Sequence, residues 1–229
     1  MVYALMSSGG KDSNLALDRA RRDGLDVRFL VNIYDGISGR VAFHGVREPL
    51  IAAQAAACGL EYISAATGEQ SYEPVFLNTL ETLVERGARG VVFGNVHLAD
   101  VCAWYEERVR GAELDHIEPL WGMEPIDVVR ESVLRGFHAI VVSVDEKQGA
   151  GDLFGREIDR EFVRAVAGRS DIDPCGERGE YHTFVYNGPT FSAPIPVTRG
   201  EIRQDRGHRL LDLVPARPET NGLRTGADR

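Results

Sequence analysis

The chain contains little cysteine and no long apolar run. Its three cysteines, Cys58, Cys102 and Cys175, are widely spaced and form no CxxC pair, which is typical of a reducing compartment rather than of a disulfide framework. No segment approaches the ~18 consecutive apolar residues that a membrane-spanning helix needs. Residues 1–6 carry no basic stretch of the kind that begins a signal peptide. We therefore expect a cytoplasmic protein.

Positive charge is also scarce. The 229 residues include 26 lysines and arginines against 35 aspartates and glutamates, and the formal net charge is −9. Because non-specific binding to nucleic acid depends on cationic contacts with phosphates, this balance disfavours a nucleic-acid partner. Lys11 and Lys147 are the only lysines. A lysine in so arginine-rich a chain indicates a specific role, since a guanidinium does not reproduce its compact charge.

The first half of the chain alternates short apolar runs with helical patterns. With 43% apolar and 27% charged residues, the composition is that of a globular protein. Strands are predicted at residues 2–6, 27–34, 60–64 and 90–94, and helices at 13–22, 48–58, 74–86 and 100–110. This alternation predicts an α/β fold in which helices cover both faces of a parallel sheet.

The second half follows a different pattern. A helix at 126–135, a strand at 138–144 and a helix at 157–167 precede two predicted β-hairpins, one turning at Asn187-Gly188 and one around Asp205-Arg206-Gly207. The sequence therefore predicts three parts: an α/β domain at residues 1–122, a smaller substrate-binding α+β domain at 123–214, and a flexible polar tail at 215–229.

A glycine-rich loop joins the first predicted strand to the first helix, with the sequence Ser8-Gly9-Gly10-Lys11-Asp12-Ser13. Glycines let backbone N–H groups turn toward a phosphate, and the following helix adds its positive N-terminus. Asp12 would repel a bare phosphate, but a Mg²⁺ ion between them removes the conflict, because magnesium prefers oxygen ligands. The spacing excludes both a Walker A loop and a GxGxxG fingerprint.

A second polar segment, residues 173–184, precedes the first predicted hairpin. It places Glu177, Glu180 and His182 beside the aromatic residues Tyr181 and Phe184. One interpretation of such a segment is an ordinary solvated turn without a binding role. Its carboxylates can also bind a cation or position an amine nucleophile, and a histidine there can move protons.

The string at residues 8–13 resembles the pyrophosphate loop of the N-type ATP pyrophosphatases, whose nucleotide-binding domain is a HUP/Rossmann-like parallel-sheet fold. The resemblance implies that ATP is cleaved between its α and β phosphates and that Mg²⁺ is the metal cofactor. It also implies that residues 8–13 cradle the pyrophosphate and that Lys11, Asp12 and Ser13 act in catalysis, with Asp12 as the metal ligand. The motif does not identify the substrate that is adenylated.

Further segments resemble the diphthine–ammonia ligase family over nearly the whole chain up to about residue 196. They are residues 173–184 with Gly188-Pro189-Thr190-Phe191, and also Phe43-His44, Gly94-Asn95-Val96, Pro119-Leu120-Trp121-Gly122 and Leu153-Phe154-Gly155-Arg156. Members of this family form an amide from a carboxylate and ammonia and release AMP and pyrophosphate. The best known act on the diphthine carboxylate of elongation factor 2. Arg178 and His182 stand where those enzymes have glycine and glutamate, a variant that resembles the bacterial-type members and leaves the acceptor open.

The resemblance extends the nucleotide site to the ends of other strands. The residues that it implies there are Asn32 and Tyr34 beside adenine, His44 near the nucleotide or the acceptor, and Gly94 and Asn95 near the ribose or the α-phosphate.

The partners implied in the same way are a carboxylate acceptor, on a small molecule or a protein, and ammonium or another amine. Glu177, Glu180 and His182 are the residues expected to bind them. Related enzymes with hairpin-rich C-terminal parts are often dimers, so the resemblance also suggests a homodimer.

Two other functions remain open on the sequence alone. Sulfur transfer to tRNA occurs among proteins with an SGGxDS loop and would use a persulfide on Cys102 or Cys175, although the acidic balance and the lack of a CxxC module disfavour it. A non-catalytic ATP-binding sensor can have the same fold. An Asp12→Ala substitution distinguishes the sensor from the ligase, because a ligase loses turnover whereas a sensor can keep its nucleotide affinity.

Overall fold

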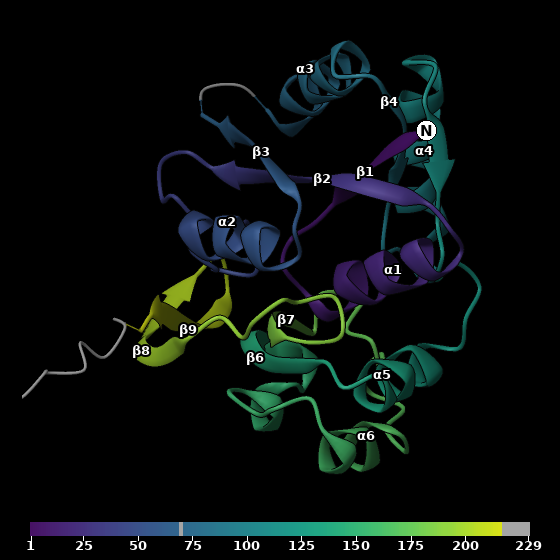
Figure 1. Ribbon diagram of the computed structural model, residues 1–229. Helices are drawn as coiled ribbons and strands as arrows, with labels where there is room; N and C mark the ends of the chain where they lie inside the picture. The colour runs from purple at the N-terminus through teal and green to yellow at the C-terminus, as the bar shows by residue number, and fades with distance from the viewer. Residues whose placement is uncertain (69–70, 217–229) are drawn as a thin grey trace, which may run out of the picture.

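The computed structural model describes residues 1–68 and 71–216, and these residues form two β-sheets (Figure 1). The first sheet is parallel and has the strand order β3-β2-β1-β4-β5. Its strands are β1 (Val2–Met6), β2 (Asp26–Asp35), β3 (Glu61–Thr67), β4 (Ala88–Val92) and β5 (Asp115–Ile117). The chain reverses its direction of winding at β1, and ligands of open parallel sheets bind beside such a reversal, at the carboxyl ends of the strands.

Helices cover both faces of this sheet. The core with Leu5 and Leu30 contains the buried side chains of α1 (Lys11–Arg22) and α2 (Glu48–Ala57). The core on the opposite face contains Val31 and the buried side chains of α3 (Tyr72–Glu85), with α4 (Ala99–Gly111) packed on the same side. Successive strand residues thus face opposite layers, as strand geometry requires. The predicted α/β fold is confirmed, and the short strand β5 is an addition that the sequence analysis missed.

The second sheet is antiparallel and has the strand order β7-β6-β9-β8. Its strands are β6 (His138–Asp145), β7 (Tyr181–Asn187), β8 (Val197–Asp205) and β9 (His208–Pro215). The accompanying helices are α5 (Pro125–Leu134), α6 (Arg160–Val166) and the short 3₁₀ turns η1 (Glu146–Gln148) and η2 (Gly151–Leu153). The α+β character predicted for the second half is confirmed. The predicted division after residue 122 falls between β5 and α5.

One of the two predicted hairpins is present. The turn at Arg206 and Gly207 joins β8 to β9, and both residues have positive φ (48° and 86°), as a two-residue type I′ turn requires. The prediction of a hairpin at Asn187-Gly188 is wrong, because β7 pairs with β6 and not with the strand that follows it. Neither Asn187 nor Gly188 has positive φ. Three prolines among residues 189–196 also lack the N–H groups of a strand ladder.

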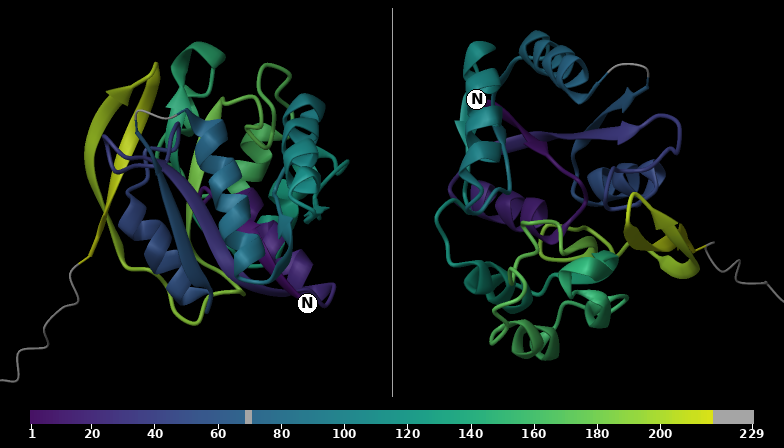
Figure 2. Two further views of the ribbon diagram at one scale, coloured as in Figure 1. Left: turned by 90° about the horizontal axis from the view of Figure 1, so that it is seen from above. Right: turned by 180° about the vertical axis from the view of Figure 1, so that it is seen from behind.

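The two sheets share one core. The second sheet and its helices lie on the side of the first sheet that carries α1 and α2 (Figures 1 and 2). The backbone amide of Val185 in β7 donates to the carbonyl of Gly9 over 2.9 Å. β7 therefore packs directly against the loop that follows β1.

No helix among the described residues is long and apolar enough to cross a membrane. The last strand, β9, ends at Pro215, which is the first residue of the predicted tail. Residues 217–229 of that tail lie outside the described residues.

Candidate functional site

A cavity of about 610 Å³ opens at the carboxyl ends of β1, β2 and β4. Both halves of the chain contribute to its wall, which includes residues 6–8, 10–13, 32–33, 41–44, 93–95, 175–177 and 181–183, with Tyr72, Leu98, Val101 and Tyr105. The structure thus brings the glycine loop and the second polar segment together. Of the residues predicted for the site, Gly9, Tyr34 and Glu180 are the ones that do not line this cavity.

The glycine loop places the start of α1 at the cavity. Gly9 has φ +82°, and a Cβ there would lie 2.5 Å from Cδ1 of Ile51, so this position requires glycine. Gly10 is the N-cap of α1. The hydroxyls of Ser7 and Ser13 lie 3.0 Å apart, and the Ser7 oxygen also accepts from the amide of Gly9 over 3.0 Å. The positive end of α1 therefore faces the cavity, where it favours an anion.

Lys11 forms part of the cavity wall, and its side chain is 3% exposed. Its ammonium donates to Oδ2 of Asp12 over 2.9 Å and to the carbonyl of Cys175. Burial acts to lower the pKa of Lys11, but the nearby negative groups, with Asp12 foremost, raise it well above its ordinary value. Lys11 thus stays charged and links the glycine loop to the second polar segment. The sequence and the family resemblance had suggested a phosphate contact and a catalytic role for Lys11, but not this link to the second segment.

Asp12 combines a paired and an unpaired oxygen. Its Oδ1 is buried and has no hydrogen-bond partner among the described residues. Burial raises the pKa of Asp12, and Lys11 partly opposes this effect. Burial also raises the pKa of Glu177, and the Asp12 charge adds to the shift. Both carboxylates line the same cavity, and an unpaired buried carboxylate oxygen in its wall fits a hard divalent cation such as Mg²⁺.

The turn after β4 packs against the glycine loop. A Cβ on Gly94 would lie 2.7 Å from the carbonyl carbon of Asp12, so the two backbones touch here. Asn95 is held by Glu118, whose carboxylate accepts a hydrogen bond from the Asn95 side-chain amide over 2.6 Å and another from its backbone amide over 3.2 Å. Glu118 was not predicted as a site residue, and nothing in the local sequence distinguishes it.

The two residues predicted beside adenine have different positions. Asn32 is buried in the cavity wall and donates to the carbonyl of Ser7 over 2.8 Å. Tyr34 lies farther along β2, at a position that pairs with Ala66 of β3. The structure therefore retains Asn32 as a candidate and places the Tyr34 side chain outside the cavity wall.

Glu180 organises the second polar segment instead of lining the cavity. It is 2% exposed. Its Oε1 accepts from the amide of Asp173 over 2.7 Å, and its Oε2 from the amide of Arg178 over 3.1 Å. Both oxygens are thus used to fold the segment, so the predicted contact of Glu180 with ammonium or the acceptor does not agree with this geometry. Glu177 does line the cavity and accepts from the amide of Val96 over 3.1 Å.

Histidines gather at the side of the cavity formed by β7 and the segment between β2 and α2. The rings of His44 and His182 lie 4.4 Å apart, and His208 of β9 lies 5.9 Å from His182. Burial lowers the pKa of His44 to about 4, and burial together with the neighbouring histidines lowers that of His182 well below its ordinary value. Both rings are therefore neutral at pH 7. His208 was missed because it lies 26 residues beyond His182 in a hairpin strand.

Asp212 of β9 fixes the segment that carries His44. Its Oδ1 lies 2.9 Å from Arg40 Nη1, and its Oδ2 lies 2.6 Å from Arg47 Nη2. Burial acts to raise the pKa of Asp212, but the hydrogen bonds from the two arginines lower it to about 2. Asp212 thus connects the second sheet to the segment between β2 and α2.

An aromatic wall closes the other side of the cavity. The rings of Phe93 and Tyr105 lie 4.8 Å apart, and the hydroxyls of Tyr72 and Tyr105 lie 3.0 Å apart. These residues come from α3, α4 and the end of β4, so only the tertiary structure brings them together. The cavity therefore has a polar floor and an apolar wall, a combination typical of sites for small molecules.

Comparison with known proteins matches the two halves of the chain to two domains of one family. Residues 1–114 match the family model described as the diphthamide synthase N-terminal domain, and residues 124–213 match the diphthamide synthase C-terminal domain. No curated protein matches the chain. Among solved structures, a predicted subunit of tRNA methyltransferase from Methanocaldococcus jannaschii is 14% identical, with a TM-score of 0.38, over 63% of this chain and 78% of that one. This likeness is too distant to carry an argument about function.

Proposed function

Because the chain belongs to the diphthamide synthase family, we propose that it is an AMP-forming ligase, which adenylates a carboxylate with ATP and lets ammonia or another amine displace the AMP. The family and the cavity both support an enzyme of the ATP pyrophosphatase type. The observation that carries the proposal is the unpaired Oδ1 of Asp12, which is buried at the start of α1 in a cavity wall that Glu177 also lines.

The glycine loop is the part that would bind the phosphates of ATP. The first turn of a helix has N–H groups without helical partners, and residues 10–13 present this turn to the cavity. The hydroxyls of Ser8 and Ser13 can add hydrogen bonds. Stabilising the charge that develops as pyrophosphate leaves is the main catalytic need in such a reaction.

Asp12 and Glu177 are the residues that would hold Mg²⁺. The ion, when bound, would neutralise charge on the phosphate oxygens and on both carboxylates. Lys11 is engaged with Asp12 and with the carbonyl of Cys175. Its part in the proposal is to orient Asp12 and to hold the second polar segment over the site.

His44 and His182 lie where an acceptor would enter. Because both rings have a strongly lowered pKa, they offer hydrogen bonds rather than positive charge at pH 7. An acceptor carboxylate would then meet neutral hydrogen-bonding rings on this side, while the Lys11 ammonium and the start of α1 are the positive groups of the cavity wall. The nitrogen nucleophile would approach from the side of Glu177.

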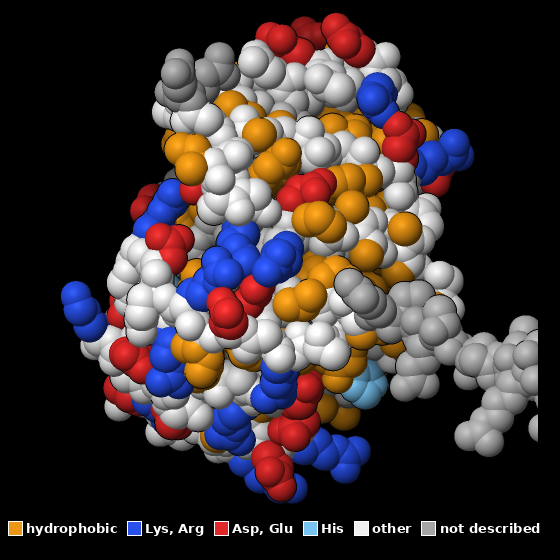
Figure 3. Space-filling model, turned by 90° about the vertical axis from the view of Figure 1, so that its left-hand side faces the viewer, with side chains coloured by type: hydrophobic (Ala, Val, Ile, Leu, Met, Phe, Trp, Pro, Cys, Tyr) orange, Lys and Arg blue, Asp and Glu red, His pale blue; other side chains and the backbone are white. Residues whose placement is uncertain are grey.

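The geometry gives less support to sulfur transfer. Cys175 lines the cavity, but its thiol is buried and donates to the carbonyl of Pro125 over 2.8 Å. Burial raises the pKa of this thiol far above neutral pH, and sulfur chemistry needs the thiolate. On the face drawn in Figure 3, the basic side chains of the described residues are interspersed with acidic ones and form no continuous basic track. Both observations disfavour sulfur transfer through Cys175.

Analysis of the nucleotide products tests the proposal. The protein would be incubated with ATP, Mg²⁺, ammonium and a small-molecule extract, and AMP with pyrophosphate would be resolved from ADP with phosphate. We expect AMP and pyrophosphate only with wild type and extract together, and fractionating the extract then leads to the acceptor. ADP and phosphate would contradict the proposal.

Two variants make the result specific to the site. Asp12→Ala should lower turnover by about 100-fold or more, since it removes a group aimed at the reacting phosphates. Glu81→Ala, an exposed carboxylate on α3, is the matched control and should not change the rate. If neither wild type nor variants turn ATP over but all still bind it, two alternatives are left: a macromolecular acceptor that the extract lacks, or the non-catalytic sensor.

A further inference from the structure

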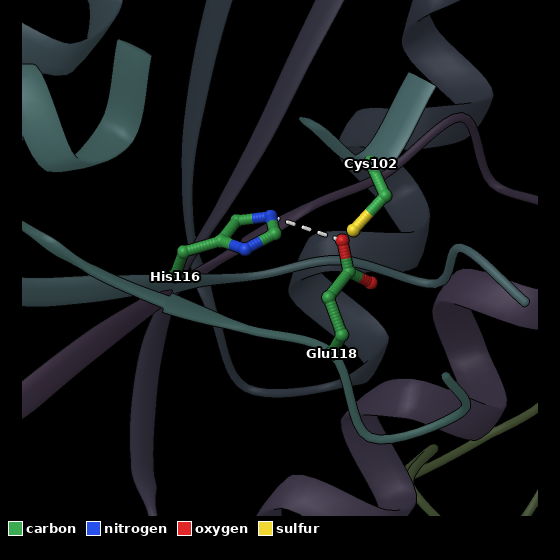
Figure 4. Close-up of side chains that lie close together, drawn as sticks. All are labelled: Cys102, His116 and Glu118. Atoms are coloured by element: carbon green, nitrogen blue, oxygen red, sulfur yellow. Dashed lines mark ion pairs between the residues drawn. The ribbon is translucent and has the colours of Figure 1, made fainter. Parts of the chain in front are cut away.

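Beside the cavity, three side chains of different chemistry converge outside the nucleotide loop. Cys102 of α4, His116 of β5 and Glu118 just after β5 place a sulfur, an imidazole nitrogen and a carboxylate oxygen within 4.8 Å of one another (Figure 4). The close-up shows the thiol and the ring pointing toward the same carboxylate oxygen. None of the three was predicted as a metal ligand, because they come from a helix, a strand and a loop.

The imidazole of His116 is buried, and its Nε2 atom lacks a hydrogen bond within the described part of the chain. The side chains of His116 and Glu118 are 4% and 8% exposed. Nε2 of His116 lies 3.0 Å from Oε1 of Glu118, but it has no hydrogen bond in favourable geometry to any described residue. A buried polar atom without a hydrogen bond costs about 1–3 kcal/mol. A ligand that accepts the nitrogen lone pair would remove this cost.

We propose that Cys102, His116 and Glu118 bind a Zn²⁺ ion, with water at the remaining position. Thiolate, imidazole and carboxylate are the three ligand types that zinc uses in proteins, and a site with three protein ligands keeps one position open. Magnesium would not compete here, because it prefers sites made of oxygen alone.

Cys102 gives the ion a route from solvent, since its side chain is only partly buried. Burial and the nearby carboxylates Glu118 and Glu106 raise the pKa of the Cys102 thiol, so the sulfur carries a proton before the metal arrives. On binding, the S–H bond breaks, the proton leaves to solvent, and a sulfur–zinc bond forms without any change of oxidation state.

The zinc site would be coupled to the cavity through Glu118. The same carboxylate accepts hydrogen bonds from the backbone amide and the side-chain amide of Asn95. Asn95 lines the cavity next to Gly94. A zinc ion on Glu118 would therefore fix the turn that packs against the glycine loop. Outer contacts of this kind orient metal ligands and tune their affinity.

Cobalt binding to the untagged full-length protein, first stripped with a chelator, tests the proposal. We expect one Co²⁺ per chain with a thiolate-to-cobalt charge-transfer band in the near ultraviolet, and displacement of Co²⁺ by Zn²⁺. Cys102→Ser and His116→Gln should abolish the band and weaken Zn²⁺ binding by more than the ~10- to 100-fold that loss of an outer contact costs. Cys58→Ser, a buried thiol elsewhere, should bind like wild type.

A second measurement needs no variant and is therefore independent of any folding defect. Zn²⁺ should protect Cys102 of the wild-type protein from iodoacetamide, as read by mass spectrometry, and Mg²⁺ should not. Asp12→Ala should keep the cobalt band, which separates this site from the proposed Mg²⁺ site. Absence of the band and of protection in wild type would overturn the proposal, as would equal Zn²⁺ affinity in wild type and Cys102→Ser. The proposal does not depend on ATP turnover.

Discussion

The backbone amide of Lys11 donates a hydrogen bond to Oγ1 of Thr183 over 3.0 Å, across 172 positions of the chain. Lys11 begins α1 beside the glycine loop, and Thr183 lies in β7 of the second sheet. One N–H group at the start of α1 is thus used to position the loop, while the rest of that turn faces the cavity. The second sheet is therefore part of the site and not only a neighbour of it.

Replacing Thr183 with valine should separate the two halves of the site. The change keeps the shape but leaves the buried amide of Lys11 without an acceptor, which costs about 1–3 kcal/mol of the free energy of unfolding. Urea denaturation measures this loss, and ATP binding should weaken with it. Thr183→Ser keeps the hydroxyl and is the matched control. Equal stability of the two variants would show that the hydrogen bond does not hold the loop.

A Gly94→Ala substitution should displace the glycine loop. The new Cβ would lie 2.7 Å from the Asp12 carbonyl carbon and 2.8 Å from the Ser13 nitrogen, and backbone atoms cannot yield as a side-chain end can. We expect loss of ATP binding in calorimetry. Gly111→Ala, at the end of α4 with nothing within 4 Å of its Cβ, should bind ATP normally and gain up to about 1 kcal/mol of stability. Normal ATP binding by Gly94→Ala would contradict the proposed nucleotide site.

Glu180 and Glu177 should respond differently to replacement by glutamine. In Glu180→Gln, an amide group faces one of the two backbone N–H donors, so the free energy of unfolding should fall by about 1–3 kcal/mol. Glu177→Gln can still accept from Val96 and loses only the charge beside Asp12. Its stability should therefore hold while turnover falls ~10- to 100-fold, as for weakened metal binding. The reverse pattern would exchange the roles assigned to the two carboxylates.

Acid should destabilise the fold through the histidine cluster. The pKa of His44 is about 4 in the folded protein, against 6.5 without burial. Between these values the unfolded chain binds a proton that the folded chain does not, so stability falls as the pH drops from 6.5 toward 4. At about 1.4 kcal/mol per pKa unit, His44 accounts for up to about 3 kcal/mol.

Urea denaturation at pH 7, 6 and 5 measures this dependence. His44→Asn should flatten part of it, and His138→Asn, which changes an exposed histidine on β6, should leave it unchanged. An identical pH dependence in wild type and His44→Asn would assign the acid sensitivity to other groups.

Much of the fold was predictable because its signals are local. Alternating apolar runs and helical patterns sufficed for the parallel sheet, and the two positive-φ residues of the β8–β9 turn were foreshadowed by Arg206-Gly207. Asn187-Gly188 carried the stronger turn signal and was misleading. Turn propensity cannot determine which strand becomes the partner, and here β6 supplies the ladder for β7.

The glycine loop was likewise determined by the sequence alone, since its residues are contiguous and Gly9 needs a conformation that other residues rarely adopt. The tertiary structure decided what surrounds the loop. It placed Glu177 and Asp12 in the wall of one cavity, used both oxygens of Glu180 within its own segment, and brought Cys102, His116 and Glu118 together. These contacts join residues far apart in the chain, and they form only when both sheets bury their apolar faces in one core.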